Sequence, residues 1–80
     1  MKVYILTKVN GYAQLESLTP FADKSEAKKE LLRQYDECSN DRDYDFSFVG
    51  DNKTHAELSA SGSTEFDYSW DITEIETDVL

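Results

Sequence analysis

The segment Thr64–Ile75 alternates between apolar and polar side chains along its whole length, reading TEFDYSWDITEI. Successive side chains of a β-strand point to opposite faces, so this pattern predicts a strand with one apolar and one polar face. The apolar face must be covered by another element, which predicts a layered fold built around this strand. The apolar set is Phe66, Tyr68, Trp70 and Ile72, and the polar set is Glu65, Asp67, Ser69, Asp71 and Thr73.

Residues 2–18 predict a β-hairpin. Lys2–Val9 is apolar on both faces, which is typical of an interior strand. The Asn10-Gly11 dipeptide that follows favours a two-residue type I′ turn, because both central residues of that turn need positive φ. Tyr12–Leu18 would return as the partner strand, and Thr19-Pro20 would end it. The predicted register pairs Leu6 with Leu15 and Val3 with Leu18.

The chain next predicts one helix, over residues 24–38. Asp23 can cap its N-terminus, and Glu26 follows three residues later, as in a capping box. The stripe expected to face the sheet consists of Ala27, Leu31, Tyr35 and Cys38. The basic residues expected on the solvated outer surface are Lys24, Lys28, Lys29 and Arg33.

Two further alternating segments precede the strand at 64–75. In Tyr44–Val49, the aromatic residues Tyr44, Phe46 and Phe48 share one side, which we expect to face inward. Thr54–Ser61 would turn Ala56, Leu58 and Ala60 inward and His55, Glu57 and Ser59 outward. The resulting order is β-β-α-β-β-β. We therefore predict an α+β fold in a single domain, residues 1–80, with one antiparallel sheet and one helix packed on one face. The strand order is left open.

Charge is unevenly distributed along the 80 residues. The net charge is −9; residues 1–35 carry a balance of +2 and residues 36–80 a balance of −11. So acidic a half should repel nucleic acid and anionic membranes and attract basic protein surfaces. The single cysteine excludes an internal disulfide, and the N-terminal apolar run is too short for a signal peptide or a membrane span. We expect a soluble cytoplasmic protein.

Catalytic and metal-binding patterns do not emerge from the sequence. His55 is predicted on a polar strand face and Cys38 on the apolar helix stripe, so no nucleophile–base pair is expected. Asp41–Asp45 begins like a calcium loop but continues with Phe46 where the loop needs glycine and with Asn52 where it needs glutamate. We predict no enzyme activity, no cofactor, no metal and no direct nucleic-acid binding.

A row of carboxylates on the neighbouring predicted strands remains to be explained. Like charges on adjacent strands destabilise a sheet, which suggests that the row serves a purpose such as docking on a basic groove. A purely solubilising role is the alternative. The candidate partner-binding residues are Asp43, Asp45, Glu57, Glu65, Asp67 and Asp71.

Short, strongly acidic, single-domain chains of this kind resemble the inhibitor proteins of phages and mobile elements. These include anti-CRISPR and anti-restriction proteins, several of which act as DNA mimics. The resemblance rests on length, on the acidic half of the chain and on the carboxylate-bearing strands, and no specific motif carries it. It implies a non-enzymatic protein-binding module that docks on the basic nucleic-acid groove of a host enzyme such as a CRISPR or restriction nuclease. The alternative is an accessory or oligomerising domain, for instance a homodimer, whose acidic face is only solvated.

Overall fold

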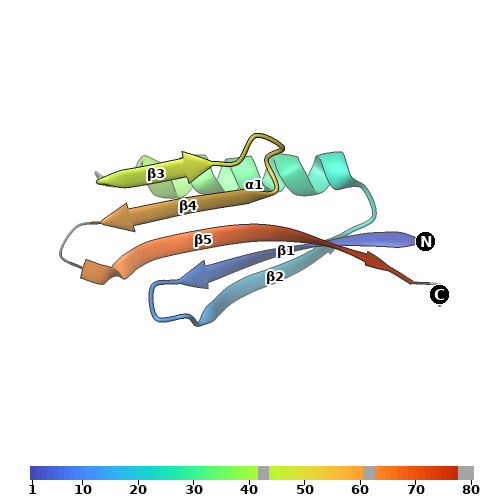
Figure 1. The fold of residues 1–80 in the computed structure, drawn as a ribbon, viewed down its shortest axis with the longest axis horizontal. Coiled ribbons are helices and arrows are strands. Elements are labelled where there is room, and N and C mark those ends of the chain that lie inside the picture. Colours follow the sequence, from blue (N-terminus) through green and yellow to red (C-terminus); the bar gives the residue numbers. More distant parts are fainter. Residues whose placement is uncertain (42–43, 61–62, 78–80) are drawn as a thin grey trace.

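A computed structural model describes residues 1–41, 44–60 and 63–77, with side chains left out for residues 63–66. Its elements follow the predicted order β-β-α-β-β-β and form one sheet and one helix, an α+β fold (Figure 1). The elements are β1 (Lys2–Asn10), β2 (Leu15–Phe21), α1 (Lys24–Ser39), β3 (Phe46–Val49), β4 (His55–Ala60) and β5 (Ser63–Glu76).

The five strands pair antiparallel in the order β2-β1-β5-β4-β3. The predicted interior position of β1 is confirmed, since it lies between β2 and β5. The long strand β5 occupies the centre of the sheet and joins the N-terminal hairpin to the β3–β4 hairpin. The alternating segment Thr64–Ile75 therefore lies within the strand that holds the two hairpins together.

The predicted register of the first hairpin is wrong. Leu6 pairs with Thr19 instead of Leu15, and an irregularity between Lys8 and Val9 shifts the pairing near the turn. The reason is a longer loop: the Asn10 side-chain oxygen accepts the backbone N–H groups of Tyr12 and Gln14, at 2.9 and 3.0 Å. The side chain of Asn10 thus accepts backbone N–H groups that would bond to the opposite strand if the turn had only two residues. The loop extends over residues 11–14.

The predicted strand end at Thr19-Pro20 is also wrong, because β2 continues to Phe21. Pro20 pairs with Ile5 within the ladder. An edge strand tolerates proline, since the N–H group that proline lacks can be the one that would point away from the sheet. The position of β2 at the edge of the sheet explains why the strand passes through Pro20.

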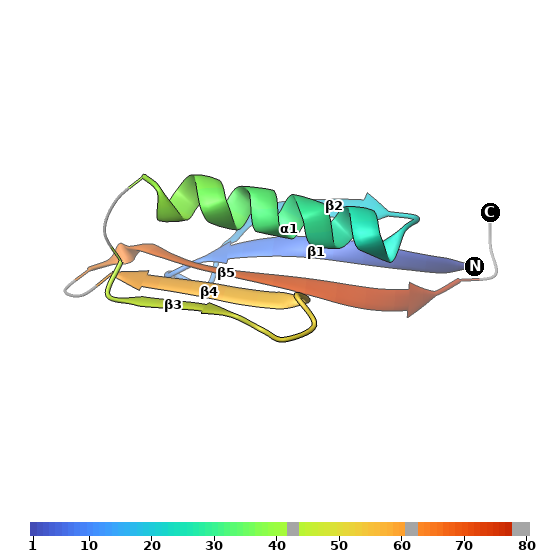
Figure 2. The same cartoon turned by 90° about the horizontal axis from the view of Figure 1, so that it is seen from above.

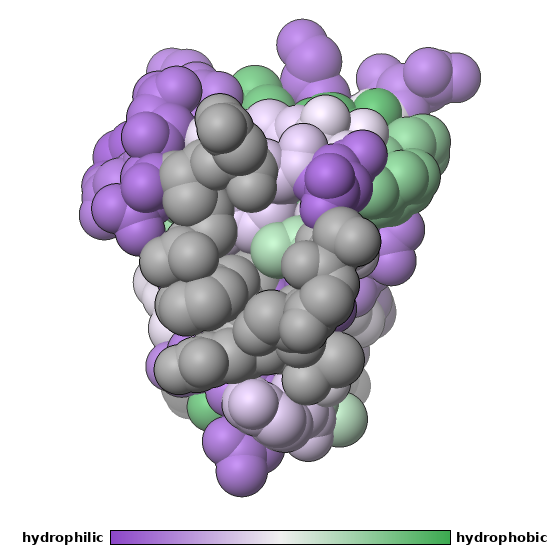
Figure 3. Space-filling model, turned by 90° about the vertical axis from the view of Figure 1, so that its left-hand side faces the viewer, coloured by the Kyte–Doolittle hydropathy of each residue, from purple (hydrophilic) through white to green (hydrophobic). Residues whose placement is uncertain are grey.

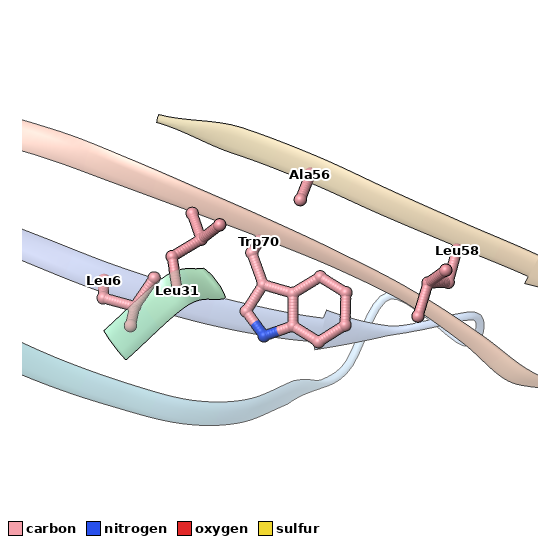
Figure 4. Close-up of a cluster of buried hydrophobic side chains, with 5 residues drawn as sticks. All are labelled: Leu6, Leu31, Ala56, Leu58 and Trp70. Atoms are coloured by element: carbon pink, nitrogen blue, oxygen red, sulfur yellow. The ribbon is translucent and has the colours of Figure 1, made fainter. Parts of the chain in front are cut away.

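Helix α1 lies on one face of the sheet (Figure 2). Asp23 caps it as predicted, accepting the Ser25 N–H at 2.8 Å. Ala27 and Leu31 are fully buried, and Tyr35 and Cys38 pack against the core, so the predicted apolar stripe is confirmed. The buried core cluster consists of Leu6, Leu31, Ala56, Leu58 and Trp70 (Figure 4).

Trp70 is the largest side chain of this core and is fully buried. Its ring meets Tyr35 of α1 edge-on at a centroid distance of 5.9 Å, and its Nε1–H donates to Gln34 Oε1 at 3.1 Å. Tyr68 and Ile72 pack against the same cluster, so the predicted apolar face of the central strand does receive the helix. Phe66, the fourth member of that face, lies outside the described side chains.

The predicted inward face of β3 is wrong. Phe46 and Phe48 are 49% and 45% exposed, and Phe48 pairs with Glu57 on the sheet face away from α1. Val49 instead lies opposite the buried Ala56. Tyr44 does pack on the core, but it precedes the strand, which begins only at Phe46. The alternation therefore does not run unbroken from Tyr44 into β3.

Candidate functional site

The sheet face opposite α1 is not covered by any other described helix or strand, and we call it the open face. Strand alternation and the pairing registers define its members. They are Val3, Ile5, Thr7 and Val9 of β1; Leu15, Leu18 and Pro20 of β2; Phe46 and Phe48 of β3; His55, Glu57 and Ser59 of β4; and Ser69, Asp71, Thr73 and Ile75 of β5.

The open face divides into two halves of different chemistry. The apolar half covers β2, β1 and the end of β5, and its members are Val3, Ile5, Val9, Leu15, Leu18, Pro20 and Ile75. The acidic half covers β3, β4 and the middle of β5, and its members are Phe46, Phe48, His55, Glu57 and Asp71. Seen from the end at which β3 begins, the hydrophobic surface at the upper right lies near β3 on the side of the sheet away from α1, and the hydrophilic surface at the upper left lies on the α1 side (Figure 3).

His55 is the centre of the acidic half. Strand pairing sets it directly opposite Asp71, and its Nδ1 lies 2.7 Å from Asp71 Oδ1. Its Nε2 lies 3.5 Å from Glu57 Oε2, and its ring lies 6.2 Å from that of Phe48, centroid to centroid. One imidazole thus bridges two carboxylates beside an exposed aromatic ring.

The pKa of His55 is raised above its ordinary value. The main cause is the hydrogen bond to Asp71, and desolvation of the ring opposes it. The charge of Asp71 and the contact with Glu57 act in the same direction as that hydrogen bond. The negative charge of the acidic half therefore changes with pH, because protonation of His55 cancels one of its two neighbouring carboxylates.

Asp67 has a structural role. Its Oδ1 accepts the backbone N–H of Ala60 at 2.8 Å, at the irregularity in the β4–β5 pairing between Leu58 and Ala60. The bulge would otherwise leave that N–H without its ladder partner. Asp67 therefore closes the end of the β4–β5 hairpin, and its carboxylate is engaged within the chain.

The predicted carboxylate row is only partly assembled in the described structure. Glu57 and Asp71 come together around His55. Asp45 lies just before β3, where its N–H donates to the Ser59 carbonyl at 3.1 Å, and Phe48 occupies the place beside Glu57 on the open face. Asp43 and the side chain of Glu65 lie outside the described residues.

Sequence reasoning did not find His55, Phe46 and Phe48 as members of the site. The alternation of Thr54–Ser61 did turn His55 outward, but only the β4–β5 register reveals that it faces Asp71. For the two phenylalanines, the signal lies in the neighbouring strand β4. Glu57 was predicted to point outward, and a residue paired with Glu57 must point to the same face, as Phe48 does.

Cys38 and His55 lie on opposite sides of the sheet. Cys38 packs on the core below α1, where its Sγ accepts from Lys8 Nζ at 3.6 Å, and Lys8 Nζ also lies 4.4 Å from the centroid of the Tyr68 ring. His55 belongs to the open face. The predicted separation of these two residues is confirmed.

The basic residues of α1 are partly neutralised within the helix. Arg33 donates to Glu30 at 2.7 and 2.8 Å and to Glu37 at 2.9 Å. The bond from Arg33 lowers the pKa of Glu30 to about 2. Lys29 lies 3.5 Å from Glu26. The outer surface of α1 therefore combines both signs of charge.

Within residues 1–41, 44–60 and 63–77 there is no cluster of three or more side chains suited to holding a metal ion, and no pocket. In the same part of the chain, no helix has the length and apolar character needed to cross a membrane. Comparison with protein family models, curated proteins and solved structures gave no match.

Proposed function

We propose that this chain is a non-enzymatic protein-binding module that docks on a basic protein surface through the acidic half of its open face. In its specific form, the proposal is an inhibitor that occupies the nucleic-acid groove of an enzyme such as a CRISPR or restriction nuclease. Carboxylates would then stand where phosphates of the nucleic acid bind. The observation that carries the proposal is the distribution of charge between the two sheet faces.

The lysines of the strands point to the α1 side of the sheet. Lys2 and Lys8 share the alternation of the buried Leu6, and they contact Glu74 and the Tyr68 ring, respectively. At the described strand positions of the open face, the charged residues are carboxylates and His55. A basic partner would therefore meet Glu57 and Asp71 without repulsion from a cation on that face.

Exposed aromatic rings support docking beside these carboxylates. Phe46 and Phe48 flank Glu57 on the edge strand and offer apolar contact next to the charge. Interfaces commonly combine aromatic anchors with a polar surround. Asp43, Asp45 and Glu65 remain proposed contacts, whereas Asp67 would add charge while holding the β4–β5 hairpin.

The test is inhibition of DNA cleavage by a panel of restriction and CRISPR nucleases. Inhibition should be competitive with DNA and should weaken steeply as salt is raised from about 50 to about 300 mM, because the contact is between charged surfaces. Glu57→Lys should relieve inhibition. Glu26→Lys, on the outer surface of α1, is the matched control and should inhibit like the parent chain.

Two results would count against the proposal. One is inhibition that is indifferent to salt, and the other is an equal loss in the Glu57→Lys and Glu26→Lys variants. If no nuclease of the panel is inhibited, the nucleic-acid-groove form is wrong. The broader proposal would then depend on whether an immobilised lysine-rich peptide retains the parent chain but not the Glu57→Lys variant.

The second candidate function is an accessory or oligomerising domain. The observation that favours it is the apolar half of the open face, which a purely electrostatic docking contact does not use. Light scattering tests the second function, because an oligomerising domain should self-associate without any basic partner.

A further inference from the structure

We infer that the apolar half of the open face is a contact surface between two copies of this chain. Leu15, Leu18 and Ile75 are 57%, 55% and 46% exposed there, beside the half-buried Ile5 and Val9. Neighbouring strands carry these side chains on one face, where only Thr7 of β1 interrupts the apolar residues of β1 and β2, so they form a patch instead of scattered exposed residues.

Charge is the reason that a second copy fits this surface. Each chain carries −9, so two copies repel one another wherever their carboxylates meet. The members of the apolar half carry no ionisable side chain. This half is therefore the part of the open face that two copies can bring together without burying carboxylates.

A two-fold axis along the strands, between β2 and β1, gives a suitable geometry. It would stack β1 of each copy on β2 of the other, with Leu15, Leu18 and Pro20 against Val9, Thr7 and Ile5. Asp71 and Ile75, both on β5, would fall outside the overlap, so Ile75 would lie at the rim of the contact. With strands about 4.8 Å and sheets about 10 Å apart, the two Asp71 carboxylates would stay about 17 Å apart. That separation exceeds the Debye length of about 8 Å at physiological salt, which limits their repulsion.

The overlap also sets the strength of the contact. Two strands of the length of β2 span a footprint of about 10 by 23 Å, well below the area of interfaces that bury about 1,200–2,000 Å² in total. We therefore expect a weak dimer that forms at high micromolar concentration. Edge-to-edge pairing through β2 is disfavoured, because Pro20 removes a donor from that strand.

The response to salt separates this inference from the proposed function. Screening the repulsion between two −9 chains should strengthen the dimer as salt rises. Docking of the acidic half on a basic surface should weaken over the same range. Either behaviour can be present without the other, so failure of one leaves the other standing.

The experiment is sedimentation equilibrium of the full chain from about 10 µM to about 1 mM, at about 50 and about 500 mM NaCl. Leu18→Lys and Phe48→Lys form a matched pair: both replace an exposed apolar residue on an edge strand of the open face, and both change the net charge by +1. Leu18→Lys should weaken the dimer about tenfold or more, because it would desolvate a charge in the contact. Phe48→Lys should leave it within about twofold of the parent chain, apart from the small gain that a lower net charge brings.

Circular dichroism and the emission of the buried Trp70 confirm that each variant is folded, and Leu18→Ser gives a milder second disruption. A parent chain that stays monomeric at the highest concentration in high salt overturns the inference. So does a dimer that weakens as salt rises, since that contact would be made by opposite charges. Equal weakening by Leu18→Lys and Phe48→Lys would assign the contact to the face as a whole and would also overturn it.

Discussion

Replacement of Asp67 tests whether its carboxylate stabilises the fold or only adds surface charge for docking. The Asp67 side chain accepts the Ala60 N–H at 2.8 Å in a partly buried position. Asp67→Ala removes the acceptor and leaves that N–H at the bulge without a partner. Asp67→Asn removes the charge but keeps an oxygen that can accept the same bond. The two variants lose the same charge and differ in the hydrogen bond.

The magnitude follows from the kind of bond that is lost. Hydrogen bonds to charged groups contribute about 1.5–3 kcal/mol, and a partly buried bond belongs at the lower end of that range. We expect Asp67→Ala to lower the free energy of unfolding by about 1.5 kcal/mol. The Asn variant should lose about 0.5 kcal/mol or less, because a neutral bond remains and one negative charge has gone from the chain. The total stability of a domain of this size is about 4–12 kcal/mol, so the loss in the Ala variant is readily measured.

Urea unfolding followed by the fluorescence of Trp70, the sole tryptophan, is the assay. With a slope near 1 kcal/mol/M, the midpoint of Asp67→Ala should fall by about 1.5 M. The Asn midpoint should stay within about 0.5 M of the parent. Equal midpoints for the two variants would refute the assigned role, since only the hydrogen bond distinguishes them. A larger loss in the Asn variant would refute it as well.

Two further predictions concern the core and the acidic half. Trp70→Phe should lower the free energy of unfolding by about 1.5–3 kcal/mol, followed by circular dichroism, because it leaves a cavity and removes the indole N–H. The pKa of His55 is higher in the folded chain than in the unfolded chain. Its contribution to the free energy of unfolding is therefore complete below the pKa of the unfolded chain and is lost as pH rises through the pKa of the folded chain. The free energy of unfolding should therefore decline by about 0.2–1 kcal/mol between about pH 6 and pH 9. Asp71→Asn should make this decline shallower. If the variant declines as steeply as the parent chain, the His55–Asp71 pair is not the cause of the decline.

The elements of the fold were predictable because their signals are local. The alternation in Thr64–Ile75 depends on residues two apart, and the apolar stripe of α1 on residues three and four apart. Asp23 before the helix is a signal of the same kind. Each of these patterns reports which side of an element faces the core, whatever the rest of the chain does.

Strand registers were not predictable in this way, because single side chains decide them. Asn10 accepts two loop N–H groups and so converts an expected two-residue turn into a longer loop. At β3, Phe46 and Phe48 look like core residues by type, yet Val49 takes the place opposite Ala56. A strand shifted by one residue exchanges its faces, so this local difference turns two aromatic rings toward solvent.

The candidate site depends on registers more than on composition. The sequence contains many carboxylates, and composition alone does not indicate which of them could bind a partner. Pairing distinguishes them: Asp67 is opposite an irregularity and holds a backbone N–H, whereas Asp71 is opposite His55 on the open face. A proton on His55 strengthens its bond to Asp71 and at the same time reduces the negative charge that a basic partner would meet. The same protonation should therefore favour the folded chain and disfavour docking, which is a coupling that the acidic composition by itself does not contain.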